Sequence, residues 1–156
     1  MKKIWAKVSS ILLLSLILLN MGISAHAENH SYDGKSPNYN NCASSATTKK
    51  STNLLNQNNQ KIGKVELKFS STCKTAWAKI TMDKAVTKGY EANAEITRNT
   101  DGKRYSCGSS GGNGKVVAGQ TSCYTPMVYD LDPRTSYAFG KYYGNGYIYS
   151  AYTGSY

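Results

Sequence analysis

The sequence predicts an all-β fold: a small, disulfide-stapled sandwich or barrel of short antiparallel strands. Several short segments alternate apolar and polar residues with a period of two, and turn residues such as Asp101-Gly102 and Asn145-Gly146 separate them. After residues 1–27, no segment shows the 3.6-residue period of an amphipathic helix. Four cysteines in a chain of 156 residues add the expectation of two disulfides.

Residues 1–27 predict a signal peptide for Sec-type export. Three lysines near the start precede an apolar run over residues 11–19, and Ala25-His26-Ala27 provides an A-x-A cleavage site. The apolar run is short for a membrane-spanning helix, and an uncleaved anchor is the alternative. The sequence therefore predicts a secreted chain that starts at Glu28, is extracellular or associated with the cell wall, and has no membrane span after cleavage.

The predicted mature chain, residues 28–156, is basic and of a size that suits one domain with a modest core. Three of the nineteen basic residues lie in the leader, which leaves sixteen against nine acidic residues, a net charge of +7. This charge has two interpretations: a solubilising surface, or attraction to polyanions such as anionic wall polymers. Since the longest basic run is Lys49-Lys50, the sequence does not indicate specific nucleic-acid binding.

All four cysteines follow the leader, and an even number in a small exported chain predicts two disulfides. Three connectivities are open, and we favour Cys42–Cys73 with Cys107–Cys123 because each pair brackets one compact half of the chain. Each bond would contribute roughly 3–4 kcal/mol in the chain-entropy model. We expect no metal site and no cofactor, because no Cys-x-x-Cys occurs and His30 is the only histidine after the leader.

The chain after the leader is predicted to contain an irregular, turn-prone arm over 28–41 and a single β domain over 42–156. The polar tract 56–60 is expected to be a loop. Residues 76–82 alternate regularly, and Trp77 falls on the face opposite the small residues of this segment, where it would cover a second layer. The ranges expected to form strands before the C-terminal region are 65–69, 76–82, 90–97, 103–107, 116–117 and 127–129.

Two further segments are expected to be loops. Residues 108–114 are rich in glycine, but their spacing and the Val116 that follows Lys115 do not fit a phosphate-binding loop. Asp130 to Pro133 is expected to form a turn, and its two carboxylates offer calcium binding as the alternative.

The C-terminal region is rich in tyrosine, with nine of the thirteen tyrosines from Tyr124 onward. Asn145-Gly146 is the strongest signal for a two-residue hairpin turn of type I′. This turn would place Tyr142 opposite Tyr149 and Phe139 opposite Tyr152. Alternation then separates two faces: Tyr142, Tyr147 and Tyr149 on one, and Phe139, Tyr143, Ile148 and Tyr152 on the other.

One face of this Tyr-rich hairpin must pack on the body of the domain, and the other is a candidate platform for stacking on sugar rings or for contact with a partner. The alternative is that tyrosine simply suits a half-buried strand. The candidate ligand contacts are Tyr142, Tyr147 and Tyr149, with Lys141 and Lys115 nearby in the sequence.

Five segments carry a resemblance to a known family: Asp33–Pro37, Cys42–Ala46, Gly63–Ser70, Cys73–Lys79 and Tyr124–Val128. They resemble the YjfA-like secreted proteins of Bacillus, which contain a bacterial domain of unknown function (family 2690). The resemblance spans roughly residues 32–132. It implies an extracellular domain in which Cys42 pairs with Cys73, and it implies no catalytic residue.

The sequence thus favours a secreted, non-catalytic domain that binds polyanions or glycans of the cell envelope. The alternatives are a secreted antagonist, either an inhibitor or a bacteriocin-like factor, and less plausibly a small hydrolase. A hydrolase usually needs a histidine or a pair of carboxylates. His30, the only histidine after the leader, lies in the predicted arm, and Glu91 and Glu95 would lie about 13 Å apart along one strand. No enzyme activity is predicted.

Overall fold

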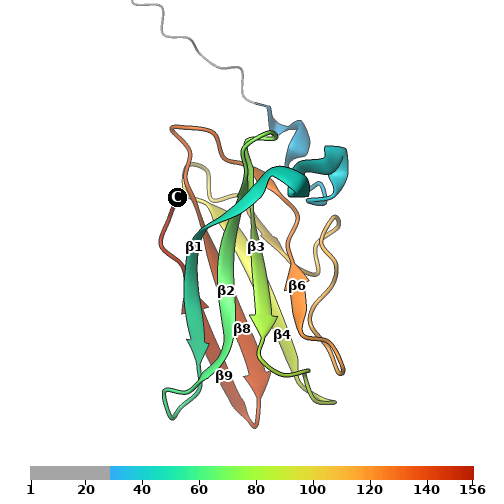
Figure 1. The fold of residues 1–156 in the computed structure, drawn as a ribbon, viewed down its shortest axis with the longest axis vertical. Helices are drawn as coiled ribbons and strands as arrows, with labels where there is room; N and C mark the ends of the chain where they lie inside the picture. The colour runs from blue at the N-terminus through green and yellow to red at the C-terminus, as the bar shows by residue number, and fades with distance from the viewer. Residues whose placement is uncertain (1–28) are drawn as a thin grey trace, which may run out of the picture.

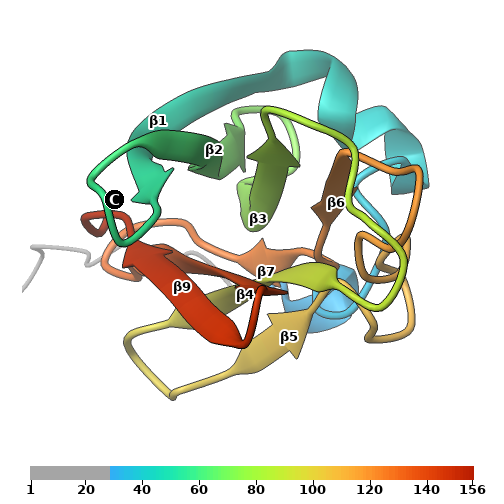
Figure 2. The same ribbon diagram turned by 90° about the horizontal axis from the view of Figure 1, so that it is seen from below.

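The structure, a computed structural model, describes residues 29–156 as two antiparallel β-sheets packed face to face. Figure 1 shows the two layers from the side and Figure 2 from below. The predicted all-β fold is confirmed as a sandwich. The predicted signal peptide lies outside the described residues.

The first sheet has the order β1-β2-β3-β6, with β7 also paired to β3, and the second has the order β5-β4-β8-β9. The strands of the first sheet are β1 (Ala46–Leu55), β2 (Lys61–Ser70), β3 (Thr75–Met82), β6 (Ser122–Tyr124) and β7 (Val128–Tyr129). Those of the second sheet are β4 (Glu91–Arg98), β5 (Arg104–Ser106), β8 (Ser136–Gly144) and β9 (Tyr147–Tyr152).

The alternating segments are strands in the structure, since β2, β3, β4, β5 and β7 overlap the predicted ranges. β1 was missed because its sequence is polar and does not alternate. Only Leu54 is buried in this strand, which is held by its pairing with β2 from Ala46↔Ser70 to Leu55↔Lys61.

The strand predicted at 116–117 is wrong: Val116 forms an isolated bridge with Ala92, through two backbone hydrogen bonds of 2.9 Å. The chain turns immediately afterwards, where Gln120 donates its backbone N–H to the Val117 carbonyl. Val116 is fully buried, so its apolar side chain is explained by packing in the core and does not require a strand.

The core lies between the sheets and is lined by small and branched apolar residues of β2, β3, β4 and β8. Gly140 on β8 marks a close approach, because a Cβ atom there would lie 2.3 Å from Cγ2 of Val65. Only a glycine therefore fits where β8 crosses β2.

A second apolar cluster covers the opposite face of β3, where Trp77 packs with Cys42, Cys73 and Met127. The layer over Trp77 is the N-terminal arm, which contains two 3₁₀ helices, η1 (His30–Tyr32) and η2 (Tyr39–Ser45). The described part of the arm is thus more regular than the sequence suggested, since it is fixed by tertiary contacts that its polar residues do not reveal.

The two disulfides join Cys42 to Cys73 and Cys107 to Cys123, with Cα–Cα distances of 5.6 and 6.0 Å. The favoured connectivity is confirmed. The first bond ties η2 to the turn between β2 and β3, and the second joins the end of β5 to β6 and therefore links the two sheets.

Both ends of the described chain lie away from the β8–β9 turn, as Figure 1 shows. The C-terminal Tyr156 exchanges backbone hydrogen bonds with Ser136, at the start of β8. The arm packs at the same end as β7, where Gly34 donates its backbone N–H to the Met127 carbonyl at 2.9 Å.

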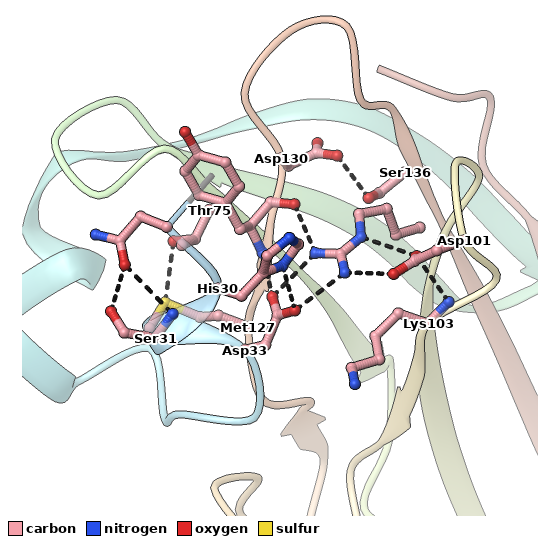
Figure 3. A network of polar contacts seen from close by, with 12 residues as sticks. His30, Ser31, Asp33, Thr75, Asp101, Lys103, Met127, Asp130 and Ser136 are labelled. Carbon is pink, nitrogen blue, oxygen red and sulfur yellow. Dashed lines mark hydrogen bonds and ion pairs between the residues drawn. The ribbon is translucent and has the colours of Figure 1, made fainter. Parts of the chain in front are cut away.

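The arm is held by the guanidinium of Arg98, whose side chain is only 1% exposed. Figure 3 labels two of its partners, Asp33 and Asp101. Arg98 donates two hydrogen bonds to Asp33 at 3.0 Å, two to Asp101 at 2.9 and 2.7 Å, and one to the Tyr129 carbonyl at 3.0 Å. All five N–H donors of the guanidinium are thereby used. Bonds to Asp101 and Asp33 raise the pKa of Arg98, and Arg98 in turn lowers the pKa of Asp101.

We predict that Asp33→Ala lowers the free energy of unfolding by about 3–5 kcal/mol, because it leaves a buried cation short of its partner. Urea unfolding followed by Trp77 fluorescence would measure the loss. Asp83→Ala is the matched control, since Asp83 pairs with Lys61 where both side chains are at least 40% exposed, and we expect it to cost less than about 1 kcal/mol. Equal, small losses in both variants would contradict a structural role for Asp33.

Candidate binding pocket at the hairpin end of the sandwich

A cavity of about 650 Å³ opens at the end of the sandwich that carries the β8–β9 turn. Three turns meet there: the β1–β2 loop, the segment that follows β3, and the β8–β9 turn, all at the lower end of Figure 1. We call this cavity the hairpin pocket. Its lining residues are Asn56, Gln57, Asn58, Gln60, Lys61, Ile62, Met82, Asp83, Lys84, Ala85, Val86, Thr87, Tyr142, Asn145 and Tyr149.

One wall of the hairpin pocket is the amide-rich loop 56–60, whose backbone conformation is stabilised by hydrogen bonds to its first residue, Asn56. Oδ1 of Asn56 accepts hydrogen bonds from the backbone N–H groups of Asn58 and Gln60, at 2.9 and 3.0 Å. Asn59 takes a φ of 58°, a conformation that asparagine tolerates well. The side chains of Gln57 and Asn58 are therefore presented on a fixed backbone.

The opposite wall consists of two tyrosines of the hairpin. The register Tyr142↔Tyr149 is confirmed, and the turn residues Asn145 and Gly146 both have positive φ, as a type I′ turn requires. The two rings stack with their centroids 6.2 Å apart and their planes at 18°. Burial raises the pKa of the Tyr142 hydroxyl.

Hydrogen bonds connect the two walls and fix the turn. The Tyr149 hydroxyl donates to Oε1 of Gln57 at 3.2 Å, across the pocket. The Tyr90 hydroxyl donates to Oδ1 of Asn145 at 2.7 Å. The hairpin pocket is therefore a preformed space between stacked rings and amide groups.

The charges of the hairpin pocket lie on one side. Nζ of Lys61 and Oδ1 of Asp83 form an ion pair at 2.6 Å, and Lys84 adds one further positive charge. Asp83 is the one carboxylate among the lining residues, whereas acid–base hydrolysis usually needs two or a histidine.

The structure divides the five residues predicted from sequence as ligand contacts. Tyr142 and Tyr149 line the hairpin pocket, while Tyr147 shares their face of the hairpin but is 54% exposed outside it. Lys141 lies on the other face of β8, 3.9 Å from Glu95. Lys115 pairs with Glu91 at 2.8 Å. The structure therefore brings two of the three tyrosines together in the hairpin pocket and places neither lysine in its lining.

Residues 30–139 match the model of a family described as "Protein of unknown function (DUF2690)". This chain belongs to the DUF2690 family. It is also 68% identical, over 157 residues that cover all of both chains, to the uncharacterized protein YjfA of Bacillus subtilis (strain 168). No solved structure matches the chain at a significant level. The resemblance noted in the sequence is thus confirmed.

The DUF2690 match ends within β8, so the β8–β9 turn and β9 lie beyond it. Tyr142, Asn145 and Tyr149 are therefore outside the matched range, although the relative from B. subtilis covers the chain to its end. The amide wall of the hairpin pocket belongs to the DUF2690 range, and the tyrosine wall does not.

Within residues 29–156 of this DUF2690 chain, no group of three or more His, Cys, Asp or Glu side chains is placed to hold a metal ion. No helix in the same part of the chain is long and apolar enough to cross a membrane. The segment from Asp130 to Pro133, whose two carboxylates were considered for calcium, contains a turn in the structure. The side chain of its first residue points inward.

That inward residue is Asp130, which is 4% exposed. Its Oδ1 accepts a hydrogen bond from the Ser136 hydroxyl at 2.7 Å, and its Oδ2 has no hydrogen-bond partner among residues 29–156. Burial raises the pKa of Asp130 to about 7, against the opposing charge of Arg98 and with a smaller contribution from Asp132. Asp130 is not among the residues that line the hairpin pocket.

We predict that Asp130 makes the domain less stable as the pH rises. Its pKa in the folded state lies above the unfolded value of about 4, so the folded state holds the proton more tightly between these values. This contribution is complete below about pH 4 and is lost as the pH passes about 7, by up to the order of 4 kcal/mol. Urea unfolding at pH 5 and pH 8 would measure it.

Asp130→Asn should remove this part of the pH dependence, while Asp132→Asn, at an exposed neighbouring position, should retain most of it. Asp101 does not confuse the comparison, because its lowered pKa affects stability only below about pH 4. Equal slopes for the wild type and Asp130→Asn would show that Asp130 is ionised throughout.

Proposed function

We propose that this chain is a secreted, non-catalytic domain that binds a glycan of the cell envelope in the hairpin pocket. The observation that carries the proposal is the pair of stacked rings, Tyr142 and Tyr149, facing amide side chains across an open cavity. A cavity of about 650 Å³ lies within the usual range for small-ligand sites.

The chemistry of the lining suits a polyhydroxylated ligand. Each amide side chain offers both donors and an acceptor, and each sugar hydroxyl likewise donates and accepts. The ring face of Tyr149 carries partial negative charge and attracts the C–H edge of a sugar ring. Because the β1–β2 loop is already fixed by Asn56, little conformational entropy is lost on binding.

The basic charge of the chain supports an envelope location. The net charge of +7 after the leader attracts anionic wall polymers over distances of about a Debye length, near 8 Å at physiological salt. Lys84 places one positive charge at the hairpin pocket. Charge would bring the domain to the wall, and the pocket would provide the short-range recognition.

Two observations support secretion. Residues 1–27 have the features of a cleavable signal peptide. The four cysteines form two disulfides, which are typical of proteins that leave the reducing cytoplasm.

We predict that Tyr149→Ala weakens binding to purified cell walls about 5- to 150-fold, if stacking on a sugar ring is worth the roughly 1–3 kcal/mol of aromatic stacking on a nucleic-acid base. The oxidised chain from residue 28 onward would be sedimented with walls, with and without teichoic acids, across a salt series. Asn58→Ala, in the opposite wall of the hairpin pocket, should also weaken binding.

Tyr137→Ala is the matched control, because Tyr137 lies on the outer face of β8 and does not line the hairpin pocket. It should bind as the wild type does. Binding that resists salt and requires Tyr149 supports the proposal. Binding that is lost at high salt or on removal of teichoic acids, and that is unchanged in Tyr149→Ala, would make surface charge the only attraction. No binding at all would refute an envelope ligand.

A further inference from the structure

β9 forms an unpaired edge of the second sheet. It pairs with β8 on one side, and no strand within residues 29–156 pairs with its other side. The hydrogen bond from the Thr153 N–H to the Ala138 carbonyl, at 2.9 Å, fixes which residues face β8. In an antiparallel ladder the direction alternates, so Ile148, Ser150 and Tyr152 point their backbone N–H and C=O groups away from the molecule.

The other edges carry the features that usually prevent strand pairing. β1 has two register shifts and the charges of Lys49 and Lys50. β5, β6 and β7 have only two or three residues each. β9 differs from all of these, because its six residues contain no charge and no proline, and its register with β8 is uninterrupted.

The side chains of β9 are also unusually exposed. Ile148 is 71% and Tyr152 is 62% exposed, the two highest values among the large apolar residues that the structure describes. Both point to the outer face of the sheet, on either side of Ser150. An edge with free backbone groups and uncovered apolar side chains is suited to accept another strand.

We propose that β9 pairs with β9 of a second copy of this chain, antiparallel about a two-fold axis at Ser150. Each outward-facing residue then exchanges two backbone hydrogen bonds with the second copy, and the two four-stranded sheets become one continuous sheet. This arrangement is a closed, symmetric dimer.

The sequence of β9 is complementary to itself in this register. Ile148 lies opposite Tyr152 of the second copy, and the same β-branched and aromatic pair forms again on the other side of the axis. Ser150 lies opposite its own equivalent, so no like charges meet. The symmetry covers the two most exposed apolar side chains of each copy at once, which a strand of unrelated sequence would do only by chance.

The dimer would place its two hairpin pockets at opposite ends of the joined sheet, because antiparallel pairing sends the two β8–β9 turns in opposite directions. Two sites on one rigid body can engage two points of a polymer, and the gain comes from effective concentration. The dimer itself does not depend on the proposed glycan ligand.

We predict that the oxidised chain from residue 28 onward sediments with twice the monomer mass at micromolar to millimolar concentration, measured by analytical ultracentrifugation. Ile148→Lys should raise the dissociation constant of the dimer at least about tenfold, because it adds the kind of charge that protects other edges. Asn53→Lys, the same charge change at an exposed position of β1, should leave the dimer intact.

Ser150→Pro tests the backbone directly. The Ser150 N–H points away from β8, so proline there should keep the fold and remove a central hydrogen bond of the dimer. Circular dichroism and thermal unfolding would confirm that both edge variants remain folded.

A cysteine at the axis tests the geometry. Ser150→Cys should form a disulfide between copies, because directly opposed residues have Cα atoms about 5.5 Å apart, whereas Asn53→Cys should not. A monomer at every concentration would overturn the proposal. So would a dimer that neither edge variant weakens, or one that does not cross-link at residue 150, since either would place the contact elsewhere.

Discussion

The guanidinium of Arg98 is the constraint on which the rest of this domain depends. It is buried and keeps its charge at any physiological pH, so each of its five donors needs an acceptor at a fixed angle. Asp33 from the arm, Asp101 from the β4–β5 turn and the Tyr129 carbonyl from β7 supply them. Three segments distant in sequence are thereby held at one end of the sandwich, which leaves the three turns at the opposite end to form the hairpin pocket.

How far the sequence predicts this structure depends on whether the signal is local. The Asn145-Gly146 turn specifies the hairpin register residue by residue, because the turn type and strand alternation are local properties. The contact of Arg98 with Asp33 spans 65 residues and leaves no local trace. The amide tract at 56–60 was recognised as a loop, but only the sandwich topology brings it to Tyr149. Lys115 looked available in the sequence, yet Glu91 on a neighbouring strand pairs with it.

The scaffold contacts and one wall of the hairpin pocket share the DUF2690 range, and the other wall lies beyond it. The DUF2690 match over residues 30–139 contains the Arg98 contacts and both disulfides. The tyrosine wall of the hairpin pocket and the unpaired edge of β9 both belong to the hairpin that follows. The tyrosine wall and this edge therefore lie in the part of the second sheet that the family match does not cover.

The position of the chain ends has a consequence for how the domain is presented. The arm and Tyr156 both lie away from the β8–β9 turn. Anything attached through either end, whether a tether, another domain or an affinity tag, would therefore extend away from the hairpin pocket. The domain can be anchored through either end while the hairpin pocket stays open to solvent. This makes it suited to display on a larger assembly or on an engineered surface.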